Sequence, residues 1–217
     1  MSRIASFTVN PFYENSYVLW DETGECVIID PGHYTKEEKE EITDFITQHK
    51  LTPKYLINTH CHIDHVLGNK FIAEKYTVPL MMHKGEVPVL NEVINYAPTF
   101  GIYYQQSPDP EIFVDEGAIV QFGNTELKVF FTPGHSPASV CFYCEKDKYI
   151  IGGDVLFYDS IGRTDLPGGD YDTLINSIKN KLMVLPDDVK VYAGHMQATT
   201  IGRERKLNPF LNGSYIP

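Results

Sequence analysis

The stretch Thr59-His60-Cys61-His62-Ile63-Asp64-His65 contains three histidines and one aspartate within six consecutive positions, 60 to 65. At this composition a His-x-His-x-Asp-His pattern arises by chance in roughly one chain in a thousand. Side chains two apart on extended backbone share a face, so His60 and His62 can bind the same ion. If a helix begins at Asp64, then Asp64 and His65 turn to a different side. The stretch therefore predicts a metal site with ligands for two ions.

Three further candidate ligands follow apolar runs. His135, Asp154 and His195 each come directly after a glycine at the end of a strand-like segment. A glycine lets the backbone turn tightly there and leaves the next side chain pointing outward. Ions such as zinc accept imidazole and carboxylate ligands readily. The full set can hold two divalent ions if one carboxylate bridges them. We expect Zn²⁺ first, with iron or manganese as alternatives.

The rest of the chain alternates short β-rich runs with helical periodicity. Thr35 and Glu38 form a capping box at the start of one helix. The segment 83–115, which contains several prolines, predicts a helical or looped excursion rather than a regular element. The pattern indicates one domain spanning residues 1–217, with mixed sheets. Strands are expected over 4–9, 16–20, 26–30, 55–58, 79–82, 120–122, 127–131, 139–144, 148–151 and 189–193, and helices over 36–50, 64–75, 171–185 and 201–207.

Composition excludes several classes of protein. The chain has 18 Lys and Arg against 29 Asp and Glu, a formal charge of −11. General nucleic-acid and anionic-membrane surfaces need clustered cations, so neither partner is expected. No run approaches the roughly 18–20 apolar residues of a membrane helix, and the N-terminus lacks the apolar core of a signal peptide. The four cysteines lie in apolar runs and are expected to be reduced, buried and cytoplasmic.

Several residues near the predicted ligands are open to interpretation. Asp30, Thr59 and Ser136 are candidates to orient the imidazoles, whereas Cys61 should point away from them. The aromatic segment 96–104 could form a wall of a substrate pocket, or it could pack over the sheet or at a dimer contact. His33, in Asp30-Pro31-Gly32-His33, could lie near the site; His49 and His83 are expected to be ordinary structural residues.

The order of these motifs resembles the metallo-β-lactamase superfamily over nearly the whole chain. The resemblance implies an α+β fold, an αββα sandwich with two mixed β-sheets flanked by helices, and a dinuclear site at one edge. It also implies catalytic roles for Asp64 and Asp154. By motif matching, the first ion would be bound by His60, His62 and His135, the second by Asp64, His65 and His195, and Asp154 would bridge the two.

Two further stretches, 160–170 and 200–204, look like the short bacterial glyoxalase II-like, or hydroxyacylglutathione hydrolase-like, enzymes. The resemblance implies a thioesterase in which a hydroxide that bridges the metal ions attacks a small thioester. Full-length glyoxalase II has a C-terminal helical domain that supplies cations to glutathione, whereas this chain ends 22 residues after His195. Arg163 is the candidate substrate contact. Arg203 and Lys206 could replace the missing cations.

Three other functions are to be weighed against the same ligand residues. A persulfide dioxygenase would use one iron, held by His60, His135 and Asp154. The stretch 166–170 favours the hydrolase. A nuclease of the superfamily would need basic residues that this acidic chain lacks, and a purely structural metal module would be richer in cysteine. The expected partner is a small-molecule thioester, and the expected assembly is a monomer or homodimer.

Overall fold

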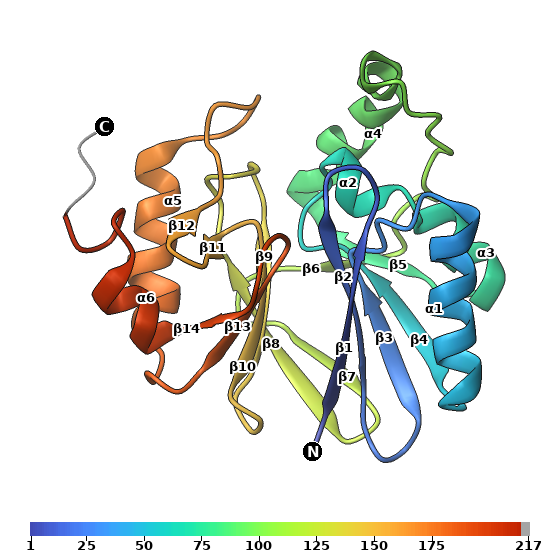
Figure 1. Cartoon of the computed structure of the whole chain (residues 1–217), viewed down its shortest axis with the longest axis horizontal. Coiled ribbons are helices and arrows are strands. Elements are labelled where there is room, and N and C mark those ends of the chain that lie inside the picture. The colour runs from blue at the N-terminus through green and yellow to red at the C-terminus, as the bar shows by residue number, and fades with distance from the viewer. Residues whose placement is uncertain (214–217) are drawn as a thin grey trace.

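The computed structural model describes residues 1–213 and arranges them as two β-sheets packed face to face, with helices on the outer side of each sheet (Figure 1). The first sheet has the order β1-β2-β3-β4-β5-β6, and the second has the order β14-β13-β10-β9-β8-β7. In the first, β1 to β3 pair antiparallel and β3 to β6 pair parallel. In the second, β10 and β13 pair parallel among antiparallel neighbours. The predicted sandwich of two mixed sheets is confirmed.

The predicted strands are present, with most bounds shifted by one to three residues. No helix within residues 1–213 is both long enough and apolar enough to cross a membrane. The strands are β1 Arg3–Val9, β2 Glu14–Trp20, β3 Glu25–Ile29, β4 Thr52–Ile57, β5 Leu80–His83, β6 Ile112–Val114, β7 Ile119–Phe122, β8 Thr125–Phe131, β9 Val140–Cys144, β10 Tyr149–Gly153, β11 Leu156–Phe157, β12 Ser160–Ile161, β13 Lys190–Ala193 and β14 Thr199–Thr200. The helical segments are α1 Lys36–Gln48, α2 Ile63–Val66, α3 Asn69–Tyr76, η1 Lys84–Glu86, α4 Val87–Tyr96, η2 Ala97–Phe100, α5 Tyr171–Ser177, η3 Ile178–Leu182 and α6 Ile201–Leu207.

The fold has four layers: helices, the first sheet, the second sheet, and helices again. Three apolar clusters hold these layers together, one between each pair of neighbouring layers. Side chains alternate across each strand, so Ile28 of β3 packs toward α1 and α3, whereas Val27 and Ile29 pack between the sheets. In the same way, Phe142 of β9 faces the first sheet and Cys141 faces α5. Strands buried on both faces explain why these runs are continuously apolar. Fully burying one such side chain contributes about 1.5–3 kcal/mol.

The helix predicted over residues 64–75 is in fact two helices. Short α2 ends at Val66, and α3 begins at Asn69 after Gly68. The backbone N–H of Gly68 donates to Pro31 O at 2.7 Å, and a Cβ at Gly68 would lie 2.5 Å from that oxygen. This close approach of two backbones redirects the chain. It also leaves α2 as a separate turn that carries Asp64 and His65 of the metal-ligand motif.

The segment 83–115 contains a regular helix that the sequence did not predict. Its prolines argued for an irregular excursion, but Pro88 lies in the first turn of α4. The N–H that proline lacks has no helical partner at that position, so proline is tolerated there. By contrast, the capping box predicted for α1 is confirmed, since Glu38 N donates to Thr35 Oγ1 at 3.2 Å and Thr35 N donates to Glu38 Oε2 at 2.9 Å.

Candidate metal centre

The seven predicted ligands meet at the edge where strands of both sheets end. His60 and His62 follow β4, and Asp64 and His65 lie in α2. The other three follow β8, β10 and β13 of the second sheet. Gly194 shows why a glycine precedes the ligand here, because a Cβ at this position would collide with Asp154 Oδ1. The repeated strand-glycine-ligand pattern therefore provides room within the site as well as a tight turn.

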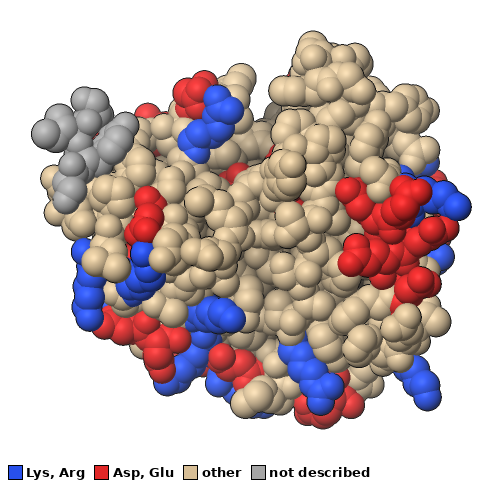
Figure 2. Space-filling model, in the orientation of Figure 1, with Lys and Arg blue, Asp and Glu red and all other residues tan. Residues whose placement is uncertain are grey.

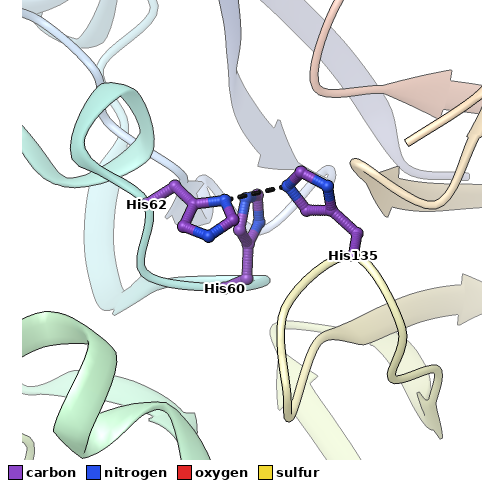
Figure 3. A group of neighbouring side chains, drawn as sticks. All are labelled: His60, His62 and His135. Carbon is purple, nitrogen blue, oxygen red and sulfur yellow. Dashed lines mark hydrogen bonds between the residues drawn. The ribbon is translucent and has the colours of Figure 1, made fainter. Parts of the chain in front are cut away.

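The first cluster consists of three imidazoles. One ring nitrogen of each of His60, His62 and His135 lies within 4.8 Å of the others. His62 Nδ1 and His135 Nε2 are 2.9 Å apart, and the three rings converge in Figure 3. Burial, reinforced by neighbouring histidines, holds the pKa of His60 well below its usual range and that of His62 at about 4. Three imidazoles whose ring nitrogens converge suit a divalent ion.

The second cluster adds a carboxylate. Asp64, His65 and His195 also offer ligand atoms within 4.8 Å of one another. Asp64 Oδ2 lies 3.0 Å from His195 Nε2 and 3.7 Å from His65 Nε2. Burial opposes ionisation of Asp64, but the charge of His65 and the hydrogen bond to His195 outweigh it and lower the Asp64 pKa. This cluster therefore combines a charged carboxylate with two imidazoles, whereas the first consists of imidazoles only.

Asp154 lies between the two clusters. Its Oδ1 is 3.4 Å from His65 Nε2, and its Oδ2 is 3.5 Å from His135 Nε2 and 3.4 Å from His195 Nε2. Burial disfavours the charge, but His65 outweighs it and lowers the Asp154 pKa. One carboxylate thus reaches ligand atoms of both clusters.

Buried polar atoms without partners indicate that the site fits metal ions. Among the described residues, His60 Nε2, His65 Nε2 and Asp154 Oδ1 are buried and have no hydrogen-bond partner. Native proteins pair nearly all such atoms. Metal ions would satisfy all three, and the imidazole and carboxylate donors are those that zinc and iron accept.

Backbone carbonyls fix the orientation of two of the rings. His135 Nδ1 lies 2.8 Å from Arg163 O, and His195 Nδ1 lies 3.2 Å from Tyr13 O. Each Nδ1–H donates to the carbonyl, which leaves the Nε2 lone pair free to face the site. Sequence reasoning missed the role of Tyr13, because a backbone contact leaves no side-chain signal.

Two of the three predicted orienting residues lie where expected. Asp30 Oδ2 is 3.1 Å from His65 Nδ1, and Asp30 also accepts bonds from the backbone and hydroxyl of Thr59. Thr59 Oγ1 in turn lies 3.1 Å from His60 Nδ1. Ser136 donates to Glu86 instead. Cys61 points away from the ligands, with its Sγ 3.8 Å from Met82 Sδ.

Glu86 is an important residue that the sequence did not reveal. It is fully buried and accepts hydrogen bonds from Cys61 N at 2.9 Å, Ala138 N at 2.8 Å and Ser136 Oγ at 2.7 Å. These bonds connect the loop of His60 and His62 to the loop of His135. Burial raises the Glu86 pKa. A single glutamate in segment 83–115, which the sequence predicts to be a helical or looped excursion, does not by itself indicate such a role.

Glu14 was missed as well, and His33 lies outside the clusters. Glu14 is fully buried, with Oε1 3.8 Å from His65 Nδ1, and burial raises its pKa. His33 is buried against the ring of Phe7, with 5.8 Å between ring centroids, and belongs to neither cluster.

The two clusters open into a cavity of about 860 Å³. Figure 2 shows the molecule hollowed at its upper edge, between α4 and loop 162–170. Arg163 lines this cavity, whereas Arg203 lies elsewhere, bonded to Asp159 and stacked over the Tyr158 ring at 3.5 Å. The lining residues are Phe12, His62, Ile63, Asp64, Pro88, Val89, Glu92, Tyr96, Thr99, Phe100, His135, Asp154, Arg163, Leu166, Pro167 and His195.

Comparison with known proteins agrees with this geometry. Residues 9–195 match the model of a family described as the metallo-beta-lactamase superfamily. The chain is 37% identical to a hydroxyacylglutathione hydrolase, GloC, from Haemophilus influenzae, over 97% of this chain and 98% of the relative. The BLEG-1 B3 metallo-beta-lactamase superposes with a TM-score of 0.89 at 34% identity, covering 97% and 100% of the two chains. A protein solved in a di-iron-bound form superposes with a TM-score of 0.86 at 34% sequence identity. The match covers 95% of this chain and 100% of that one. The chain therefore belongs to the metallo-beta-lactamase superfamily.

Proposed function

We propose that this protein is a metal-dependent hydrolase with a dinuclear site that cleaves small thioesters in the manner of glyoxalase II. The observation that carries the proposal is the position of Asp154, whose two oxygens reach His65 and His135, one in each cluster. The similarity to the hydroxyacylglutathione hydrolase of H. influenzae supports a thioester as the substrate.

In this proposal each residue has a defined task. The chain would fix the separation of the ions through Asp154 and hold the imidazole lone pairs toward them through carbonyl and carboxylate contacts. Two bound divalent ions would supply an activated water and a Lewis acid for the thioester carbonyl. The departing thiolate is a weak base, so the chain need not provide a general acid. Arg163 would contact the substrate from loop 162–170 while its guanidinium stays paired with Asp165. The proposed ligands are His60, His62 and His135 for one ion, Asp64, His65 and His195 for the other, and Asp154 for both.

The first experiment is the metal content of protein purified without chelators. We expect about two ions per chain, lowered in His60→Gln and unchanged in His49→Gln, whose histidine is exposed at the end of α1. The loaded protein should then hydrolyse lactoylglutathione or simpler thioesters. One iron per chain with oxygen consumption on a persulfide would replace the hydrolase by a dioxygenase. Two bound ions with no thioester turnover would overturn the substrate class.

A further inference from the structure

Helix α4 carries apolar side chains both into the core and along the wall of the cavity. Leu90 and Val93 are buried in the core of the first sheet. Val89 and Tyr96 are partly buried against the same core and also line the cavity, and η2 continues this surface with Phe100. Phe100 is 56% exposed. In Figure 2 the part of the molecule over α4 is nearly free of charged side chains. Whatever enters the cavity therefore meets the apolar surface of Val89, Tyr96 and Phe100.

Two other segments complete the apolar walls. The turn between β1 and β2 contributes Phe12, whose ring meets the Phe100 ring edge-on with 5.6 Å between centroids. Loop 162–170 contributes Leu166 and Pro167. The cavity, at about 860 Å³, is large enough to enclose a substantial organic group as well as the reacting carbonyl.

The charges in the cavity do not favour an anionic substrate. Apart from the predicted ligands, its charged lining residues within the described chain are Glu92 and Arg163. Arg163 already pairs with Asp165 through two bonds of 2.7 Å, which match the geometry of a carboxylate. The free carboxylates of a glutathione thioester would therefore find no uncommitted cation among the lining residues. They would also meet the negative charge of Glu92.

We infer that the cavity selects thioesters whose acyl or thiol substituent is an apolar alkyl or aryl group, in preference to glutathione thioesters. The inference rests on the proposed function, because it assumes that the scissile bond lies at the metal clusters. The apolar substituent then lies along α4 and η2, between Phe12 and Leu166, where it removes apolar surface of both partners from water.

The test is a series of thioesters that differ in one substituent. With N-acetylcysteamine as the constant thiol, acyl chains from acetyl to hexanoyl should raise kcat/KM by about three- to fourfold per methylene. With acetyl as the constant acyl group, benzyl thiol should be preferred to glutathione at least tenfold if the apolar group occupies the thiol side. A rise in either series supports the inference and identifies the side. No rise in either, or a preference for glutathione, overturns it.

Variants of α4 locate the selectivity. In Val89→Lys the hexanoyl-to-acetyl ratio of kcat/KM should fall about tenfold, whereas Ile94→Lys, an exposed position of the same helix outside the cavity, should keep it. Because Val89 is half-buried, Glu92→Leu provides a second variant at an exposed position, and it should raise the ratio several-fold. If the ratio is the same in all three variants, the apolar group does not lie on α4.

A binding measurement separates failure of this inference from failure of the proposed function. The thioether S-hexyl-N-acetylcysteamine cannot be hydrolysed, and it should bind at least tenfold more tightly than its carboxymethyl analogue, with a negative heat-capacity change. If no thioester is cleaved but the hexyl compound binds preferentially, the thioesterase proposal fails and the apolar selectivity stands. If thioesters are cleaved and neither the series nor the thioethers favour apolar groups, the selectivity fails and the function stands.

Discussion

The floor and the walls of the cavity are built in different ways. The floor consists of the seven predicted ligands, which follow strands of both sheets or lie in α2. Asp30 and Thr59 contact two of its imidazoles, and Glu86 accepts bonds from the backbone of the loops that carry His60, His62 and His135. The walls, formed by α4, η2, the Phe12 turn and loop 162–170, include several exposed side chains and few polar contacts. A change in the floor should therefore spread through a network, whereas a change in a wall should stay local. Chemistry belongs to the floor and selectivity to the walls.

The strongest test of this division is Asp154→Asn. Asparagine keeps the size of the side chain but loses the charge and one of the oxygens that reach the two clusters. We expect about one ion per chain instead of two, and a loss of thioester turnover of at least about 10³-fold, because metal-based charge stabilisation is worth several kcal/mol. Metal analysis and steady-state kinetics measure both.

Asp159→Asn is the control, since Asp159 is half-buried and pairs with Arg203 away from the cavity. It should keep both ions and normal turnover. An Asp154→Asn protein with two ions and wild-type activity would show that the clusters do not depend on a bridging carboxylate.

A second test concerns the support of the floor. In Glu86→Gln an amide –NH₂ must face the N–H of either Cys61 or Ala138, donor against donor. We expect a loss of about 2–4 kcal/mol in the free energy of unfolding and a 10- to 100-fold weaker metal affinity. Urea unfolding and metal titration measure these quantities. Glu92→Gln, an exposed position on α4, should change neither by more than a small amount, and equal effects of the two substitutions would contradict the proposed support role.

His33 tests burial separately from ligand chemistry, because it is as buried as His60 but lies outside both clusters. Burial, with a smaller contribution from the charge of Lys39, lowers the His33 pKa to about 3. Below about pH 6.5 the unfolded chain binds a proton here that the folded chain does not, so the free energy of unfolding falls as pH falls. Between pH 7.5 and pH 5 this one histidine should lower the free energy of unfolding by about 2 kcal/mol.

In His33→Leu that contribution should disappear. Urea unfolding of the metal-free protein at the two pH values measures it as the difference between wild type and variant, so that titration of the clusters cancels. His49→Leu controls for the loss of an exposed histidine. An equal pH dependence in wild type and His33→Leu would contradict the assignment.

The floor could be predicted from the sequence because its residues are rare and regularly spaced. His60 to His65 form one motif, and His135, Asp154 and His195 share a strand-glycine context, so the structure brings together the residues that the pattern selected. The mixed sheets were predictable from the apolar strand runs, whereas the αββα sandwich was implied by the resemblance to the superfamily. The exact helix bounds could not be predicted. The close approach of Gly68 to Pro31, which divides α2 from α3, is a tertiary contact.

The supports and walls were much harder to predict. Glu86 and Glu14 are single acidic residues whose importance lies in burial, which no local pattern reveals. The prolines of segment 83–115 led to the prediction of an irregular excursion instead of helix α4. Pro88 in fact occupies the first turn of that helix, where proline is compatible with a helix. The aromatic segment 96–104 left two interpretations open, and the structure places Tyr96 and Phe100 on the cavity. The cavity walls therefore lie in the part of the chain with the weakest sequence signal.

The smallest predicted effect belongs to the walls, and it tests whether they act apart from the floor. Phe100→Ala removes a ring that is 56% exposed, so the free energy of unfolding should change by no more than about 0.5 kcal/mol. If the ring covers an apolar substrate group, KM for a hexanoyl thioester should rise about three- to tenfold with kcat unchanged, because uniform binding is lost and the floor is intact. Phe113→Ala, on an edge strand outside the cavity, should change neither constant. A fall in kcat or in metal content would mean that wall and floor are mechanically coupled, and the division between chemistry and selectivity would have to be abandoned.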